Sequence, residues 1–205
     1  MTPEAASKKP QNAEKPGIRK TPSKRLMNIS LVALFAALTA SGAFIAIPVG
    51  PVPIVLQNLF ALLSGLILGP IMGGAAVALY LLAGTLGLPV FAGGTAGIAP
   101  LVGPTGGFLA GYLLSAITAG LIAGSPRAGK ATPLPRIIAA VVIGLFILYI
   151  PGVLWLKTSL NLQWPGALAI GFFPFIIGDT LKGIAAVFIA PRLRRTAAGF
   201  LDGGE

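Results

Sequence analysis

One long uncharged stretch limits what this chain can fold into: no Asp, Glu, Lys or Arg occurs between Arg25 and Arg127. A single crossing of a lipid bilayer needs roughly 20 predominantly apolar residues, so this stretch is long enough for several crossings. Over the whole chain only 10% of the residues are charged, against about 25% in a soluble globular domain. The mean hydropathy of +0.90 agrees. We therefore expect a multi-pass integral membrane protein with no room for a soluble catalytic domain.

The basic residues give information on topology. Although the formal net charge is +10, a nucleic-acid-binding surface needs its basic residues on one folded face. Here they lie in the two tails and one loop, and we expect no nucleic-acid partner. We predict a disordered basic cytoplasmic tail over residues 1–25, a transmembrane domain over residues 26–191 and a short cytoplasmic tail over residues 192–205. A cleaved signal peptide is the alternative, but the apolar stretch 29–49 exceeds the about 7–15 residues of a signal core.

Six apolar segments predict six transmembrane helices. Their expected ranges are 28–47, 54–68, 71–86, 107–123, 137–156 and 167–190. If the N-terminus is inside, the loop carrying Arg127, Lys130 and Arg136 and the basic C-terminal tail are inside too. Only Lys157 is then outside, which follows the positive-inside rule. The predicted fold is therefore an all-α bundle of six transmembrane helices with both termini in the cytoplasm.

Two charges interrupt the last predicted helix. Asp179 and Lys182 are three residues apart, so on a helix they lie on the same face. Each charge costs about 2.5–3.5 kcal/mol at the centre of a bilayer, even on insertion-based scales, and such residues are functional by default. One interpretation is a neutralising pair that helps to pack the bundle. We favour the other, a binding pocket in which the carboxylate accepts N–H groups and the ammonium holds a carbonyl or carboxylate oxygen.

Two further segments are irregular and apolar. Residues 51–57 (PVPIVLQ) bring the amide of Gln57 into a predicted helix directly behind a rigid turn. Residues 87–106 are rich in Gly and Pro, and irregular backbone at membrane depth is tolerated where it is buried in protein or lines a cavity. The helix that follows begins near Gly106 and Gly107, where its first N–H groups are unpaired. Together with Asp179 and Lys182, these segments predict a mostly apolar pocket that opens to the outside.

At these positions the chain resembles the BioY family, the biotin-specific substrate-binding (S) components of energy-coupling-factor (ECF) transporters. The resemblance covers residues 26–191 and leaves out the N-terminal tail. It is carried by LPVFAGG at 88–94, GPTGGF at 103–108, GY at 111–112, PVPIVLQ at 51–57 and DTLK at 179–182. It implies a multi-pass protein of the bacterial or archaeal cytoplasmic membrane that captures biotin. It also implies a transmembrane T component and a pair of cytoplasmic ATPase subunits as partners.

The resemblance also implies roles for single residues. Asp179 and Lys182 match the polar pair that reaches biotin, whose ureido ring offers two N–H donors and a carbonyl. Lys182 could equally hold the valerate carboxylate, as could backbone amides around Gly106, and the sequence leaves this open. Residues expected in the pocket wall or at the partner contact complete the set: Gln57, Tyr80, Thr105, Gly106 and Gly107 for the pocket, and Ala33 and Ala37 for docking on the T component. Biotin is expected as transported ligand, without cofactor or metal.

Other functions fit the residues less well. A stand-alone secondary transporter of a small vitamin-like solute would need a titratable relay, for which one Asp–Lys pair is little. An intramembrane enzyme could use Ser115 and Lys182, but no spacing links them, and His and Cys are absent. A purely structural subunit would not need buried charges. No G-x-x-x-x-G-K-[ST] motif occurs, so we expect no ATP hydrolysis by this chain. The sequence does not say whether the chain forms a homo-oligomer.

Overall fold

The computed structural model describes residues 23–48 and 50–202, so most of the predicted N-terminal tail lies outside the described residues. The described part is mostly helical. Its elements are α1 (Lys24–Ser41), β1 (Ala46–Ile47), β2 (Ile54–Val55), α2 (Gln57–Leu68), α3 (Pro70–Thr85), the 3-10 turn η1 (Ala92–Gly94), α4 (Ala99–Val102), α5 (Gly106–Ala123), α6 (Leu134–Ser159), α7 (Trp164–Gly171) and α8 (Phe173–Asp202).

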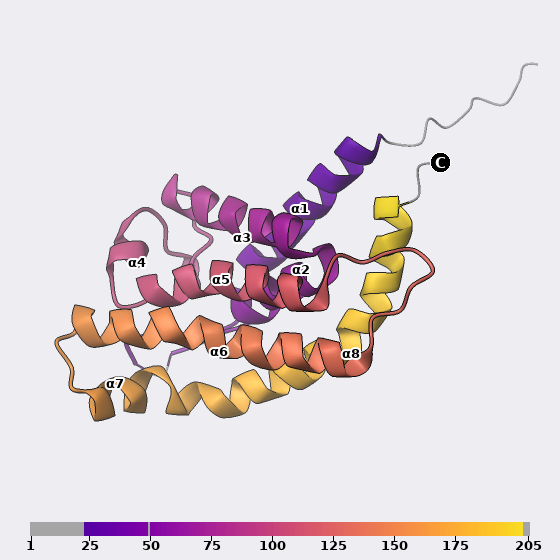
Figure 1. The fold of residues 1–205 in the computed structure, drawn as a ribbon. Coiled ribbons are helices and arrows are strands. Elements are labelled where there is room, and N and C mark those ends of the chain that lie inside the picture. The colour runs from indigo at the N-terminus through magenta and orange to yellow at the C-terminus, as the bar shows by residue number, and fades with distance from the viewer. Residues whose placement is uncertain (1–22, 49, 203–205) are drawn as a thin grey trace, which may run out of the picture.

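Helix α2 is the centre of the bundle. Every residue of α2 except Phe60 is buried, and the helix contacts α1, α3, α5, α6 and α8. Helices α5 and α6 run side by side, with α3 on one side of the pair and α8 on the other (Figure 1). A helix that is apolar on all sides has no solvent-facing surface, which is why the sequence of α2 places it inside.

Glycines allow the central helices to touch. A Cβ added to Gly65 of α2 would lie 1.9 Å from the carbonyl oxygen of Ala116 in α5, and one added to Gly111 of α5 would lie 2.4 Å from that of Leu148 in α6. Such close backbone contact is typical of membrane helices. In lipid the hydrophobic effect does not drive helices together, and small residues let them associate through close van der Waals packing.

The predicted spans agree with the helices in position but differ in length. Among the described residues, four helices are long and apolar enough to cross a membrane, namely α1, α5, α6 and α8. Helices α2 and α3 have 12 and 16 residues and are shorter than a full crossing. The number of six crossing helices therefore stays a prediction.

Two boundaries differ from the prediction for clear local reasons. The first helix ends at Ser41 and the second begins at Gln57, because residues 46–47 and 54–55 pair as a short antiparallel hairpin. The prolines Pro51 and Pro53, which lack an N–H donor, lie between the two strands. The last predicted span is split at Phe172 into α7 and α8, and α8 continues as a helix to Asp202.

One charged side chain joins the ends of two helices. Arg194 of α8 is only 4% exposed. Its Nη2 donates to the carbonyl oxygens of Ala123 and Gly124 at the end of α5, at 3.1 and 2.8 Å, and its Nη1 donates to that of Leu66 in the last turn of α2. These carbonyls have no partner within their helices, and a cation at a helix C-terminus also interacts favourably with the helix dipole.

Candidate functional site

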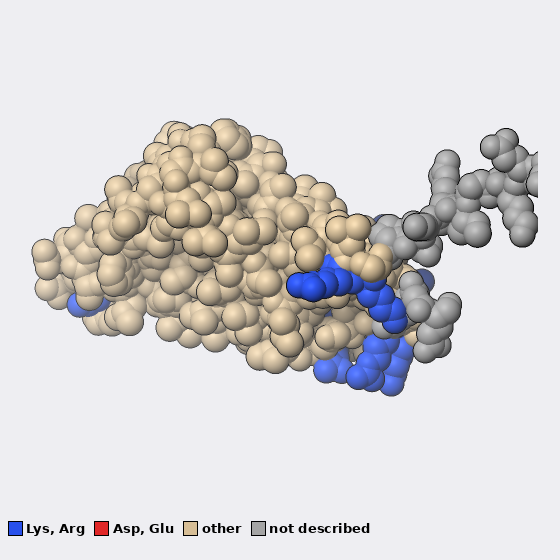
Figure 2. All heavy atoms as spheres, turned by 90° about the horizontal axis from the view of Figure 1, so that it is seen from above, with Lys and Arg blue, Asp and Glu red and all other residues tan. Residues whose placement is uncertain are grey.

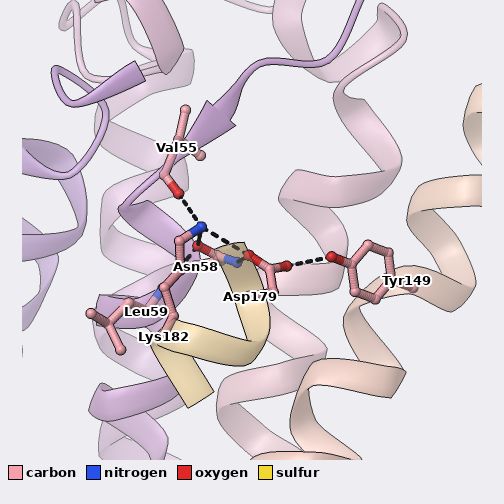
Figure 3. A network of polar contacts seen from close by, with 6 residues as sticks. All are labelled: Val55, Asn58, Leu59, Tyr149, Asp179 and Lys182. Atoms are coloured by element: carbon pink, nitrogen blue, oxygen red, sulfur yellow. Dashed lines mark hydrogen bonds and ion pairs between the residues drawn. The ribbon is translucent and has the colours of Figure 1, made fainter. Parts of the chain in front are cut away.

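A buried polar cluster joins α8 to α2, β2 and α6 (Figure 3). Asp179 Oδ1 lies 2.8 Å from Lys182 Nζ and accepts a hydrogen bond of the same length from Asn58 Nδ2. Asp179 Oδ2 accepts a hydrogen bond from the hydroxyl of Tyr149. The Asp179 and Lys182 side chains are 6% and 11% exposed. The structure therefore brings the two predicted charges together and gives the carboxylate two neutral donors as well.

Lys182 uses all of its donors inside the protein. Its Nζ donates to Val55 O at 2.7 Å, to Asn58 Oδ1 at 2.9 Å and to Asp179 Oδ1 at 2.8 Å. An ammonium group has three N–H donors, so none is left over. A ligand that takes a hydrogen bond from Lys182 must therefore replace one of these three acceptors.

Local structure explains how three separate segments meet here. Asp179 and Lys182 are one turn apart on α8, and Asn58 lies in the first turn of α2, where its Oδ1 also accepts from the backbone N–H of Leu59 at 3.1 Å. Val55 is the last residue of β2. Its peptide bond to Leu56 has its N–H bonded to Gly42 O, directly after α1, at 3.1 Å. One peptide unit thus links Lys182 to the end of α1.

Two adjoining cavities lead to the cluster. A cavity of about 280 Å³ lies between the segment after β1, α5 and the irregular segment 91–105; its polar lining residues are Gln57, Thr95, Thr105 and Tyr112. A second cavity of about 20 Å³ is lined by Asn58, Asp179, Lys182, Tyr149 and Tyr112 among others. Val52, Pro53, Val55, Phe108 and Tyr112 line both. The pair is thus reached from a largely apolar chamber, as in most small-molecule sites.

Gln57 lines the larger cavity and Tyr80 lies behind it. Gln57 is 1% exposed, and its Nε2 donates to Tyr80 Oη at 2.6 Å and to Val90 O at 3.2 Å. Tyr80 is equally buried and does not line either cavity. Of these two predicted wall residues, the structure therefore places Gln57 at the cavity and makes Tyr80 a support for its amide.

The start of α5 is built differently from what its glycines suggest. Thr105 lines the larger cavity, and its hydroxyl donates to Pro100 O at 2.9 Å. The N–H of Gly106 donates to Gly103 O at 3.0 Å. An added Cβ on Gly107 would lie 2.2 Å from the carbonyl oxygen of Pro151 in α6. Neither glycine lines the two cavities; their small size lets α5 approach its neighbours.

Segment 87–106 forms a roof over the larger cavity, and several contacts hold it against the helices. Phe91 is 1% exposed and meets the ring of Tyr80 edge-on, with the ring centroids 5.6 Å apart. Val90 O accepts the hydrogen bond from Gln57. Trp155 of α6 donates from Nε1 to Gly103 O at 2.9 Å. The roof is therefore an ordered part of the chamber wall.

The remaining predicted residues lie away from the chamber. Ala33 and Ala37 are exposed on α1, whose buried residues are Phe35, Ala36 and Thr39. Ser115 is fully buried, and its hydroxyl has no hydrogen-bond partner among the described residues. Since all of Lys182's donors bond elsewhere, the structure does not bring Ser115 and Lys182 together as a nucleophile and base.

Three residues of the site were not predicted from the sequence. Asn58 bridges both charges, Tyr149 binds the carboxylate and Tyr112 lines both cavities. The feature of the sequence that could have identified them is that each is a polar residue within an otherwise apolar helix. The chain has only three tyrosines, and all three lie at or directly behind the chamber.

Comparisons with known proteins point in one direction. The family described as BioY matches residues 12–199. A probable biotin transporter BioY of Pyrococcus horikoshii is 40% identical over 166 residues, which are 81% of this chain and 95% of the relative. The biotin transporter BioY of Thermotoga maritima is 43% identical over 162 residues, or 79% and 92% of the two chains. A crystal structure of the S-component for biotin from an ECF-type ABC transporter is similar with a TM-score of 0.75 and 30% identity, over 85% of this chain and 94% of that one.

Proposed function

The chain belongs to the BioY family, and from that premise we propose that it captures biotin as the S component of an ECF-type transporter in the cytoplasmic membrane. The observation that carries the proposal is the Asp179–Lys182–Asn58 cluster, buried at the end of an apolar chamber under an ordered roof. This arrangement suits a small, mostly apolar molecule with one compact polar group. The relatives and the similar S-component structure support the choice of biotin.

Asp179, Asn58 and Lys182 receive the ureido ring of biotin. The ring's N–H groups donate to the carboxylate of Asp179, while its carbonyl accepts from Lys182 or Asn58 in place of one internal bond. The valerate carboxylate is a poor partner for Lys182. Asp179 Oδ1 is only 2.8 Å from Lys182 Nζ, so a valerate carboxylate bound to the same ammonium would lie close to the carboxylate of Asp179 and be repelled by it. The tail therefore lies in the larger cavity, where Tyr112 offers a hydroxyl group as a donor.

Six helices cross the membrane, with α2 and α3 as the two short ones and both termini in the cytoplasm. The start of α1, the loop between α5 and α6 and the end of α8 lie at the same end of the molecule (Figure 1). That end carries most of the described cations, whereas Lys157 belongs to the last turn of α6. This distribution supports the orientation, since cytoplasmic loops are enriched in Lys and Arg.

A T component and a pair of ATPase subunits supply the energy, and the exposed face of α1 around Ala33 and Ala37 docks on the T component. Small side chains let a second helix approach closely. The polar groups of this face are already satisfied, because Ser30 and Ser41 donate to Leu26 O and Ala37 O, both at 2.9 Å.

Isothermal titration of biotin into the detergent-purified chain tests the proposal. We expect one-to-one binding that is lost in Asp179→Ala and Lys182→Ala. In Asp179→Asn we expect a loss of about 1.5–3 kcal/mol, the usual value of a hydrogen bond to a charged group. Thr180→Val, an exposed neighbour on the same helix, is the control and should bind normally. No heat from a folded wild-type chain would refute biotin as the ligand, and unchanged binding in Asp179→Asn would make the pair a packing device.

A further inference from the structure

A long apolar groove runs between α6 and α8 on the outside of the bundle. Its volume is about 500 Å³. It begins near Ile138 in the first turns of α6 and Phe188 of α8, and it ends near Tyr149 and Phe172. Among its lining side chains Val142 and Ile184 are exposed. In a membrane this groove faces lipid, because nothing else in the described chain covers it.

A small basic hollow lies one helical turn beyond the groove on α8. It has a volume of about 30 Å³, more than one ordered water needs, and is lined by Lys130, Thr132, Pro191, Arg194 and Arg195 among others. The Lys130 and Arg195 side chains are exposed and make no hydrogen bond or ion pair within the described chain. Thr132 Oγ1 accepts from Arg194 Nε at 3.1 Å, so its own O–H remains available as a donor.

Groove and hollow lie on one continuous face of α8. Residues 180, 184, 187, 191 and 195 follow one another at three or four positions, which is the spacing of a single helix face. The first three line the groove and the last two line the hollow. Helix α8 bends in its second half (Figure 1), and Pro191 lies within it; proline is the usual cause of such a bend.

No described acid neutralises this end of the molecule. Asp179 is the only carboxylate among the described side chains; it belongs to the polar cluster and lines the groove at its Tyr149 end, away from the hollow. Figure 2 shows that most of the visible basic side chains gather at one end of the molecule. An anion with an apolar portion thus finds a complete complementary surface: positive charge and a hydroxyl in the hollow, and an apolar groove leading away from it.

We propose that the α6–α8 groove and the adjoining hollow form a binding site for one acidic phospholipid. The phosphate lies between Lys130, Arg195 and the hydroxyl of Thr132, and one acyl chain lies in the groove. Basic pockets next to membrane helices on the cytoplasmic side are suited to anionic headgroups. The groove favours a lipid over free phosphate, which would use only the hollow. A protein helix is less suitable, because its backbone would not place an anion beside Lys130 and Arg195.

Native mass spectrometry of the purified full-length chain tests this site. The chain is titrated with dioleoyl phosphatidylglycerol, with dioleoyl phosphatidylcholine and with inorganic phosphate. We expect phosphatidylglycerol to bind at least ten-fold more tightly than phosphatidylcholine. The double variant Lys130→Gln/Arg195→Gln should lose about five-fold in phosphatidylglycerol affinity for each charge removed. The matched control Lys24→Gln/Arg25→Gln removes the same charge outside the hollow and should change this affinity less than two-fold.

A second variant separates the groove from the hollow. Val142→Trp should narrow the groove and weaken both lipids without affecting inorganic phosphate. Unchanged phosphatidylglycerol binding in Lys130→Gln/Arg195→Gln would overturn the proposal. Inorganic phosphate that binds the chain as tightly as phosphatidylglycerol would also overturn it. A dimer that dissociates in Val142→Trp, with lipid binding unchanged, would instead assign the groove to a second copy. Biotin binding serves as the check that each variant is folded.

Discussion

At the scale of single residues, the polar cluster is costly to break and modest in net value. A buried ion pair recovers much of its desolvation cost only when further hydrogen bonds complete it. Here Asn58 serves both charges, since it donates to Asp179 and accepts from Lys182, and Tyr149 completes the carboxylate. The free chain therefore keeps its charges satisfied before any ligand enters.

A pair of single variants and their combination test this arrangement. Lys182→Met leaves the carboxylate of Asp179 buried without a cation, which typically costs about 3–5 kcal/mol. In Asp179→Asn/Lys182→Met no unpaired charge remains, so we expect the double variant to be more stable than Lys182→Met alone. Unfolding midpoints in detergent provide the comparison. Additive losses in the double variant would show that the two charges do not interact in the folded chain.

The sequence predicted the pair but not its partners, and the reason is distance along the chain. Asp179 and Lys182 are one turn apart, so helix geometry alone places them together. Asn58 lies 121 positions from Asp179, and Tyr149 lies 30 positions away. No local pattern determines which face of α2 or α6 turns toward α8. The roles of Gly106 and Gly107 were also ambiguous in the sequence, because a glycine can make room for a neighbouring helix as readily as for a ligand.

At the scale of elements, segment 87–106 is the part whose behaviour decides entry and exit of a ligand. Its backbone is irregular, but Phe91 fits against Gly84, where an added Cβ would lie 2.2 Å from the ring. The N–H of Gly97 also donates to Gly84 O at 2.8 Å. Near α5 the corresponding fastening is the single bond from Trp155 to Gly103. The contact near α5 is therefore easier to break, because it is a single hydrogen bond.

Trp155→Phe removes that hydrogen bond while keeping an aromatic ring. Because the roof is then held less firmly near α5, we expect biotin to dissociate several-fold faster, while the association rate changes little. A neutral hydrogen bond is worth about 0.5–1.5 kcal/mol, which bounds the effect at roughly ten-fold. Stopped-flow displacement of bound biotin measures it. Trp164→Phe, near Lys157 instead of the roof, is the control; an equal change in both variants would contradict a specific role for Trp155.

Element lengths show what hydropathy could and could not predict. The apolar segments located every long helix, because burial in lipid requires the same composition wherever it occurs. The first and second spans were overestimated at their facing ends, since residues 46–47 and 54–55 are as apolar as a helix but pair as β1 and β2. The break at Phe172 was missed although Gly171 and Pro174 flank it, because the apolar run continues without interruption from one helix into the next.

At the scale of the whole molecule, a short chain of hydrogen bonds connects the binding chamber to the end of α1. In the peptide unit between Val55 and Leu56, the carbonyl oxygen accepts a hydrogen bond from Lys182 Nζ and the N–H donates one to Gly42 O. Gly42 directly follows the last residue of α1, and a Cβ there would lie 2.8 Å from Gln57 N. A ligand that takes the place of Val55 O at Lys182 therefore acts on a segment in direct contact with α1.

The exposed face of α1 is nevertheless separate from the chamber, and this separation can be tested. Ala37→Trp places a large ring where a second helix would approach, yet Ala37 lines neither cavity. We expect normal biotin affinity in the isolated chain together with loss of co-purification with the T component and of ATP-dependent uptake. Leu121→Trp, at an exposed position of α5, adds the same ring elsewhere and should preserve both. If Ala37→Trp still assembles and transports, the partner contacts another face; if it loses biotin binding, α1 belongs to the binding site itself.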